Sequence, residues 1–407
     1  MRNWPTVSLG DVVDLLAGFP FKSARFQESP KNGVALVKGE NVSQGRILWS
    51  VSKYWPEREY DEFSKYHLVP GDVVIAMDRP WVPAGLKWAF IRNDDPRALL
   101  VQRCARLRSK SGELDQQFLR FLIGGPLFER YIRPITTGVN VPHISGAQIL
   151  AFKFPLPPLA IQRRIASILS AYDDLIENCE RRIRVLDEMA RALYREIFLA
   201  DPQSERVSAQ QLIDSGVLEI NDGYRAKNSE LGPEGLPFAR AGNINAGFHF
   251  TDADLLAEEN VPKAGSKVSR PGDIVFTSKG TVGRFAKVRE GTPRFVYSPQ
   301  LCFWRTLKPE VLSSNFLYQW MQSREFLDQV DQVKGSTDMA DYVSLTNQRR
   351  MMVRVPGREA LRRGEVALAP IDELIGNLTA QKENLRQTRD LLLPRLLSGQ
   401  LSVEDMG

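Results

Sequence analysis

The sequence predicts an α+β protein: two mixed α/β domains separated by two long, antiparallel-packed helices, with an internal pseudo-twofold duplication. Two observations predict this fold: a segment pattern that occurs twice, and a long stretch of helical periodicity at the end of each copy. The clearest repeat is Val69-Pro70-Gly71-Asp72-Val73-Val74-Ile75, which returns as Arg270-Pro271-Gly272-Asp273-Ile274-Val275-Phe276. Because solenoids and propellers repeat every ~20–50 residues, so long a period indicates two whole domains, each with its connector.

Four further pairs of segments occur in the same order in both halves. They are Lys38–Val42 with Arg240–Ile244, Gln102–Cys104 with Gln300–Cys302, Phe118-Leu119 with Phe316-Leu317, and Asp174–Ile176 with Glu373–Ile375. The repeat predicts a first domain at 1–157, a first spacer helix at 158–200, a second domain at 201–357 and a second spacer helix at 358–407. Such a duplicated domain is suited to contact two places on one extended partner, and DNA is such a partner.

The composition is that of an ordinary globular protein, with 43% hydrophobic and 25% charged residues. The net charge of +5 suits a polyanionic partner without identifying one. Cys104, Cys179 and Cys302 are scattered and lack metal-ligand spacing, which favours a reducing cytoplasm over a disulfide framework. The first residues form no apolar signal segment and no apolar run is long enough to span a membrane, so we expect a cytoplasmic location.

Each domain is predicted to be rich in short strands. Val34–Val37, Val73–Ala76 and Trp88–Ile91 are apolar runs bounded by turn residues. Asp115–Arg133 has the apolar spacing of a helix, and Ser314–Val330 is its counterpart in the second copy.

The first long helix is predicted from Leu159 to Phe198, a stretch without Gly or Pro that follows Phe154-Pro155-Leu156-Pro157-Pro158. At 1.5 Å per residue it would be about 60 Å long. Its apolar residues recur at steps of three and four, which is a heptad seam. A second seam predicts a helix from Ile371 to about Leu397. The seam residues that we select as candidate partner contacts are Ile165, Ile168, Tyr172, Leu175, Ile183, Leu186, Leu193, Leu374, Leu378, Leu385 and Leu392.

Signatures of catalysis are missing from the sequence. No Asp or Glu is followed two places later by Lys, as in many nucleases, and no phosphate-binding loop of the GxxxxGK type occurs. The only adjacent prolines, Pro157-Pro158, precede Leu159 instead of the aromatic residue of amino-methyltransferases. His67, His143 and His249 are isolated, so we expect no metal site and no catalytic residues.

The loop after each Pro-Gly-Asp strand is the main candidate for DNA contact. In the second copy it is Thr277–Arg284, where glycines allow close approach of the backbone and basic side chains can reach phosphates or guanine edges. Its counterpart, Met77–Trp81, has different residues, as two different half-sites would require. The segments Thr136–Ser145 and Lys334–Ser344 form a second candidate pair, which could equally cap the helices that follow.

The individual candidates for DNA contact come from these loops and from the Lys38 and Arg240 segments, whose asparagines are equally good turn formers. They are Lys38, Asn41, Arg79, Thr136, Thr137, Asn140, His143, Arg240, Asn243, Ser278, Lys279, Thr281, Arg284, Lys334, Ser336 and Thr337.

Phe154–Ile165 resembles the proline-rich entry to the first conserved helix of the specificity subunits of type I restriction–modification enzymes. Asp173–Phe198, the Pro-Gly-Asp elements and the ending Leu396–Leu401 resemble the same family, as does the duplication itself. The second copy lacks the clean proline entry and has Arg354-Val355-Pro356-Gly357-Arg358 in its place.

The resemblance implies a non-catalytic subunit with two target-recognition domains, each of which reads one half of a bipartite, asymmetric DNA site. The helices would set the spacer and recruit methyltransferase subunits and, through them, restriction subunits with motor and nuclease activity. This chain would bind no cofactor, while the complex would use S-adenosylmethionine, together with ATP and Mg if a restriction subunit is present. The alternatives are a stand-alone sequence-specific DNA-binding regulator and a coiled-coil scaffold without a nucleic-acid role.

Overall fold

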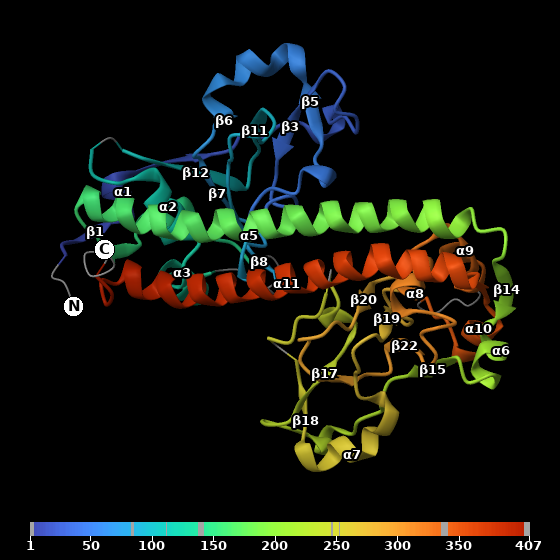
Figure 1. The fold of residues 1–407 in the computed structure, drawn as a ribbon. Helices are drawn as coiled ribbons and strands as arrows, with labels where there is room; N and C mark the ends of the chain where they lie inside the picture. Colours follow the sequence, from blue (N-terminus) through green and yellow to red (C-terminus); the bar gives the residue numbers. More distant parts are fainter. Residues whose placement is uncertain are drawn as a thin grey trace. The chain divides into compact units, whose positions relative to one another are not determined.

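The computed structural model of this 407-residue chain describes residues 4–82, 85–110, 112–136, 142–245, 247–251, 253–334 and 341–402. The chain divides into two compact units. Unit 1 consists of Met1–Ile176 and Asn384–Gly407, and unit 2 consists of Glu177–Glu383. Each unit therefore contains one strand-rich part of the sequence and a part of both long helices, α5 and α11 (Figure 1).

The described residues of unit 1 form a five-stranded and a four-stranded sheet, two strand pairs and four short α-helices. The larger sheet has the order β2 (Val13–Ala17), β12 (Cys104–Ser109), β7 (Val73–Ala76), β10 (Trp88–Phe90), β4 (Gln44–Gly45). The smaller has the order β5 (Tyr54–Pro56), β3 (Gly33–Val37), β11 (Ala98–Leu100), β6 (His67–Leu68). The pairs are β1 (Thr6–Ser8) with β13 (Lys153–Pro155), and β8 (Trp81–Val82) with β9 (Gly85–Leu86). The helices are α1 (Leu9–Val12), α2 (Gln116–Ile123), α3 (Pro126–Ile135) and α4 (Gly146–Leu150).

In the part of unit 2 that the structure describes there are two four-stranded sheets, one strand pair and five short α-helices. The first sheet has the order β15 (Leu218–Asp222), β22 (Leu301–Thr306), β19 (Ile274–Thr277), β20 (Phe285–Lys287). The second has the order β16 (Leu231–Gly232), β18 (Leu255–Leu256), β17 (Leu236–Ala239), β21 (Val296–Tyr297), and the pair is β14 (Glu205–Ser208) with β23 (Met352–Val355). The helices are α6 (Ala209–Asp214), α7 (Val261–Ala264), α8 (Ser314–Met321), α9 (Arg324–Val333) and α10 (Leu345–Arg350).

The principal elements follow the same order in both units. The strand order β2-β12-β7-β10 of unit 1 has its counterpart in β15-β22-β19-β20 of unit 2. In the second sheets, β11 pairs in parallel with β3, and β21 pairs in parallel with β17. The strands predicted at Val34–Val37, Val73–Ala76 and Trp88–Ile91 are confirmed as β3, β7 and β10.

The repeated Pro-Gly-Asp segment is a turn that leads into the central strand of each first sheet. Gly71 and Gly272 adopt φ values of +98° and +91°, which favour glycine. Asp72 accepts a hydrogen bond from the backbone N–H of Val69 at 2.8 Å, and Asp273 accepts one from that of Arg270 at 2.9 Å. The aspartate thus closes the turn within its own loop.

The same aspartate forms a two-pronged ion pair with an arginine on the neighbouring strand. Asp273 is fully buried and accepts hydrogen bonds from Nε and Nη2 of Arg305 at 2.7 and 2.8 Å. In unit 1, Nε and Nη2 of Arg108 donate to Asp72 in the same way. Planar guanidinium and carboxylate groups that pair twice fix each other's orientation. The pair therefore locks the turn to β12 in unit 1 and to β22 in unit 2.

The long helices are α5 (Leu159–Tyr194), which continues as a π-helical turn at Arg195–Leu199, and α11 (Arg358–Leu397) (Figure 1). The first predicted helix is confirmed, whereas the second begins before the predicted Ile371. α11 contains a glycine, Gly364, at a position where a side chain does not fit: a Cβ there would come within 2.0 Å of the Phe198 ring. Pro370 cannot bond to the carbonyl of Val366, but Val366 is 70% exposed and water can replace that bond.

Within unit 2 the two long helices run in opposite directions. Phe198 packs on Gly364, and Asp187 and Asp372 line one small cavity. Earlier residues of α5 therefore meet later residues of α11.

The buried face of the long helices differs from the predicted seam by one residue at equivalent places. Leu175 is 50% exposed and Leu374 is 38% exposed, whereas their neighbours Ile176 and Ile375 are buried. The two positions differ by one helical step of 100°, and the heptad count assigned the wrong one to the core.

The helices predicted at Asp115–Arg133 and Ser314–Val330 are each two helices. α2 ends where Gly124 and Gly125 precede Pro126, the first residue of α3. Position 124 has no room for a side chain, because a Cβ there would lie 2.1 Å from the Trp88 ring. In unit 2 the break falls at Gln322-Ser323, between α8 and α9. Among the described residues, no helix combines the length and the apolar character needed to cross a membrane.

We expect the substitution Asp273→Asn to destabilise unit 2 by about 3 kcal/mol, because it removes the buried carboxylate that pairs twice with the Arg305 guanidinium and leaves only the partly exposed Glu219 as its anionic partner. Hydrogen exchange in increasing urea, read on the peptides that carry β19 and β22, measures this change. The peptides of β7 and β12 serve as the internal control. An Asp273→Asn protein with unchanged protection in β19 would show that the pair is not what holds the turn.

Candidate nucleic-acid interface

Three segments that are distant in the sequence meet after β19 in unit 2. The backbone N–H of Val343 donates to Ser278 O at 2.9 Å, and that of Gly280 donates to Asp341 O at 3.0 Å. Arg284 Nη1 donates to Ala241 O at 3.2 Å. We call these segments, residues 240–245, 278–284 and 341–343, loop cluster 2.

The exposed side chains of loop cluster 2 include cations, an aromatic ring and one carboxylate, that of Asp341. Lys279 and Arg284 are exposed, and Tyr342 is 48% exposed. Lys279 Nζ lies 5.9 Å from the centre of the Tyr342 ring, within the range of a cation–π interaction. This surface can offer two positive charges and one aromatic face to an anionic, planar ligand.

The equivalent segments of unit 1 meet in the same way after β7. Backbone hydrogen bonds join Ile144 N to Met77 O at 2.9 Å and Arg79 N to Pro142 O at 2.8 Å. Lys87 Nζ donates to Gly39 O, as Arg284 donates to Ala241 O in unit 2. We call residues 38–41, 77–81 and 142–144 loop cluster 1.

Loop cluster 1 presents different chemistry on this shared backbone. Asp78 pairs with the His143 ring through Nδ1 and with Arg103 Nε at 3.1 Å. His143 and Arg103 have side chains that are 44% and 69% exposed, and Asp78 is 22% exposed. A carboxylate that is bonded to two basic groups replaces the lysine and tyrosine of loop cluster 2.

Backbone hydrogen bonds give the correspondence between the clusters residue by residue. Met77 N donates to Arg103 O at 2.8 Å, and Ser278 N donates to Gln300 O at 3.0 Å. Arg103 therefore corresponds to Gln300, one residue away from the pairing that the Gln-x-Cys repeat indicated. The isolated bridges Asp78–His143 and Lys279–Tyr342 are likewise equivalent.

The structure brings most of the described candidates to these clusters or close to them. Arg79, Lys279, Thr281 and Arg284 are exposed. The other basic candidates lie in ion pairs: Lys38 with Glu40 at 3.0 Å, Arg240 with Asp254 at 2.6 Å, Lys334 with Asp331 at 2.7 Å, and His143 with Asp78.

Two candidates are corrected because they are buried. Asn41 is completely buried; its Oδ1 accepts from Lys38 N at 2.8 Å, and its Nδ2 donates to Leu36 O and Ser52 Oγ. Ser278 is 1% exposed and lies between Gln300 O and Cys302 Sγ. Both shape the loops from within, and neither can reach a base edge in this conformation.

Two further candidates use their polar groups to hold turns. Asn243 repeats the role of Asn41, since its Oδ1 accepts from Arg240 N at 2.8 Å. Thr136 donates to Ile132 O at 2.9 Å and accepts from Trp81 Nε1 at 3.3 Å. The remaining candidates, Thr137, Asn140, Ser336 and Thr337, lie outside the described residues.

Four residues in or beside the clusters were not among the predicted contacts: Lys87, Arg103, Gln300 and Tyr342. Lys87 immediately precedes β10 and Arg103 immediately precedes β12, so the pairing of these strands with β7 brings both residues to the loop. The backbone does mark one of them, because Arg103 has φ +69° and the adjacent loop residue Arg79 has φ +46°. Left-handed non-glycine residues are uncommon, and they concentrate at functional sites.

The candidate partner contacts on the long helices fall into three groups by exposure. Ile165 and Leu378 are buried, at 0% and 2%, so they belong to the core and are not available to a partner. Leu175 and Leu374 are exposed. The others are partly buried: Ile168, Tyr172, Ile183, Leu186, Leu193, Leu385 and Leu392. Exposed apolar residues that were not predicted are Val185, Met189, Val366 and Leu391.

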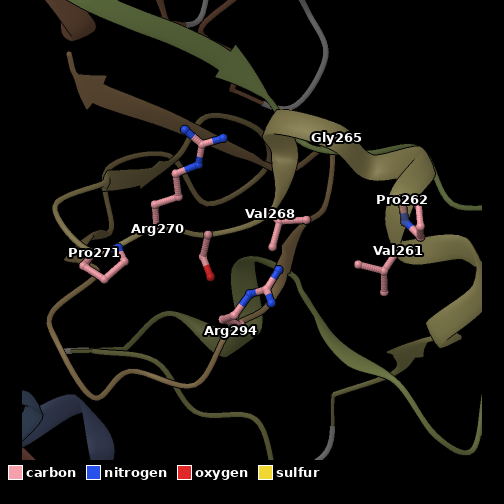
Figure 2. A pocket seen from close by; sticks show the side chains of 8 residues that line it. Val261, Pro262, Gly265, Val268, Arg270, Pro271 and Arg294 are labelled. Atoms are coloured by element: carbon pink, nitrogen blue, oxygen red, sulfur yellow. The ribbon is translucent and has the colours of Figure 1, made fainter.

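A surface hollow of about 420 Å³ lies elsewhere in unit 2. Figure 2 shows Val261 and Pro262 of α7 on one side and the Arg270 and Arg294 side chains on the other. Arg270 precedes β19, whereas loop cluster 2 follows it, so the hollow lies at the opposite end of that strand. It is therefore not part of the candidate interface.

Residues 1–188 match the family model of the type I restriction modification DNA specificity domain. The type I restriction enzyme MjaVIII specificity subunit of Methanocaldococcus jannaschii is 34% identical over 176 residues, which are 43% of this chain and 41% of that protein. The EcoBI specificity subunit of Escherichia coli is 24% identical over 99% of this chain and 87% of that protein. The first 188 residues are thus similar to the DNA specificity domain of type I enzymes, and the chain as a whole is similar to the EcoBI specificity subunit at lower identity.

Its fold is also that of a specificity subunit of known structure. The type I restriction–modification S subunit from M. genitalium superposes with a TM-score of 0.58 at 15% identity, over 97% of this chain and 96% of that one. The alignment with the MjaVIII specificity subunit spans less than half of that relative's length. Among the described residues, no group of three or more His, Cys, Asp or Glu side chains is arranged to hold a metal ion.

If Lys279 and Arg284 each contact one phosphate, we expect Lys279→Ala and Arg284→Ala each to weaken DNA binding and to reduce the slope of log Kobs against log salt by about 1. Fluorescence anisotropy with duplex DNA over a KCl series measures the slope. Lys308→Ala is the matched control, since Lys308 is exposed and follows β22 at the end remote from the cluster. An equal change for Lys308→Ala would show that loop cluster 2 has no special role in DNA binding.

Proposed function

We propose that the chain is the non-catalytic DNA-recognition subunit of a type I restriction–modification complex. One observation carries the proposal: the same backbone arrangement displays Lys279, Tyr342 and Gln300 in one unit and Asp78, His143 and Arg103 in the other. To recognise two different DNA sequences, the two domains need the same backbone framework with different exposed side chains. The relationship to specificity subunits supports the same role.

The groups of each cluster suit different base edges. Lysine and arginine donate to O6 and N7 of guanine or to phosphates, and a tyrosine ring can pack on a base or a sugar. A carboxylate such as that of Asp78 accepts from the amino group of cytosine, and Arg103 beside it can donate to guanine or phosphate. The two domains, 1–157 and 201–357, would therefore read unlike halves of a bipartite, asymmetric site.

The long helices would form the spacer of this proposed reader. We infer that they pack antiparallel along their length and relate the two domains by a pseudo-twofold axis, as the opposite directions within unit 2 suggest. The 36 residues of α5 give a length of about 54 Å. That exceeds the ~34 Å between successive major-groove positions on one side of DNA.

The exposed apolar residues of the helices are the proposed contacts for methyltransferase subunits. Leu175 and Leu374 occupy equivalent places, and Val185 and Met189 are one turn apart on α5. Methylation with S-adenosylmethionine would be supplied by those subunits, and ATP- and Mg-dependent cleavage by restriction subunits. The missing nuclease, phosphate-loop and methyltransferase motifs support this division of labour.

The decisive experiment is a genome-wide methylation map of cells that carry this chain with its neighbouring methyltransferase, compared with cells that lack only this chain. We expect a split, asymmetric motif that disappears with the chain. If methylation does not depend on the chain, and the purified chain alone selects a DNA sequence, the chain is a stand-alone DNA-binding regulator.

We expect exchange of residues 1–157 for the same domain of another specificity subunit to change one half-site only. The reason is that loop cluster 1 is formed entirely within that domain, and loop cluster 2 entirely within residues 201–357. The methylated motif of the chimera measures the outcome. A change in both half-sites would show that the domains do not read independently.

A further inference from the structure

An aspartate occupies equivalent places on the two long helices, and in each unit it is paired with basic residues. Asp173 precedes Asp174-Leu175-Ile176 on α5, and Asp372 precedes Glu373-Leu374-Ile375 on α11. Asp173 is 17% exposed and Asp372 is 23% exposed. Neither residue belongs to a loop cluster.

In unit 1 the basic residues come from a short helix and from the other long helix. Arg120 of α2 donates to Asp173 Oδ2, and Arg389 of α11 donates to Oδ1 at 2.7 Å. The Arg120 side chain is 13% exposed, and its Cζ lies 4.7 Å from the centre of the Phe90 ring on β10. One carboxylate thus joins the globular part of unit 1 to both long helices.

In unit 2 the basic residues come from the sheet. Lys287 Nζ donates to Asp372 Oδ2 and Arg289 Nε donates to Oδ1, both at 2.8 Å. The Lys287 side chain is 5% exposed and that of Arg289 is 16% exposed. Arg289 Cζ lies 5.7 Å from the centre of the Tyr318 ring on α8. The globular part of unit 2 is thereby joined to α11.

The cation and the aromatic ring have exchanged places between the units. Phe90 and Lys287 are equivalent, because each lies opposite the first residue of the Pro-Gly-Asp strand, Val73 or Ile274.

The second half of the exchange lies on the short helices. Arg120 and Tyr318 are equivalent, because each is the fifth residue after the N-cap of its helix, Asp115 or Ser313. Unit 1 therefore has an aromatic strand residue and a basic helix residue, and unit 2 has the reverse. Either exchange alone would leave two cations and no ring in one unit, or would remove one of the two cations that bond to the aspartate. The paired change indicates that the contact itself is maintained.

We propose that Asp173 and Asp372 are positioning residues that fix the angle at which each recognition domain stands on the long helices, and thereby the separation of the two half-sites. The inference rests on the proposed function and deepens it. Apolar contacts alone are non-directional and permit small rotations, whereas a carboxylate bonded through both oxygens to two different basic side chains favours one orientation.

The test is Asp173→Asn in the complex with the methyltransferase. The substrates are a set of DNA sites that keep both half-sites but have the natural spacer or one base pair more or fewer. We expect the preference for the natural spacer to fall about ten-fold, because the amide nitrogen faces an arginine and the coupling is lost. The half-site sequences should stay unchanged.

Asp174→Asn is the matched control, since Asp174 is the exposed neighbour on the same helix and should leave the preference as it is. A second variant transplants the arrangement of unit 2 into unit 1. Arg120→Tyr should reduce the preference, and Phe90→Lys combined with it should restore most of that preference. Unit 1 already has the equivalent of Arg289: Arg92 follows Phe90 by two residues, as Arg289 follows Lys287. The double variant therefore reproduces the arrangement of unit 2 more fully.

Reduced methylation on all spacers in equal proportion would overturn the proposal, because it would show a role in stability alone. A changed half-site, or a double variant no better than Arg120→Tyr, would overturn it as well. Failure of the proposed function would look different: the unmodified complex would then methylate no split motif at all.

Discussion

The two-pronged ion pair between each Pro-Gly-Asp aspartate, which is buried, and an arginine of the neighbouring strand is the constraint on which both units depend. Asp273 bonds to Arg305 through both oxygens and also closes its own turn at Arg270. This fixes where β19 begins relative to β22, and because the strand has four residues, it also fixes where loop cluster 2 begins. The site at one end of the strand is therefore held in place from the other end, by residues that no ligand touches.

Sequence reasoning predicted the features of the fold that depend on local patterns. The duplicated turn and the uninterrupted seam of α5 are such features, since glycine conformation and helical spacing are properties of neighbouring residues. The prediction failed where contacts between residues far apart in the sequence determine the structure. α11 contains Gly364, on which Phe198 packs, so a residue that weakens a helix lies inside it, and Leu175 faces outward because its neighbour Ile176 fills the core.

The candidate site was predicted in outline for a similar reason. The loops after the Pro-Gly-Asp strands were found because their composition is unusual, and Lys279 and Arg284 are indeed exposed there. Asn41 and Ser278 have equally suitable polar groups, but the structure buries them as internal braces. Arg103 and Lys87 could not be found, because strands that are far apart in the sequence bring them to the loop.

The equivalence of the two loop clusters extends to single hydrogen bonds, since Arg79 N bonds to Pro142 O as Gly280 N bonds to Asp341 O. The equivalent segments of the two units therefore share one backbone framework. Under the proposed function, a chain that carried the segments of loop cluster 2 in both units would present the same surface twice. Its target would then be a palindrome, and each strand of such a target would be the other's copy. The asymmetry of the natural target would accordingly reside in a few side chains and not in the architecture.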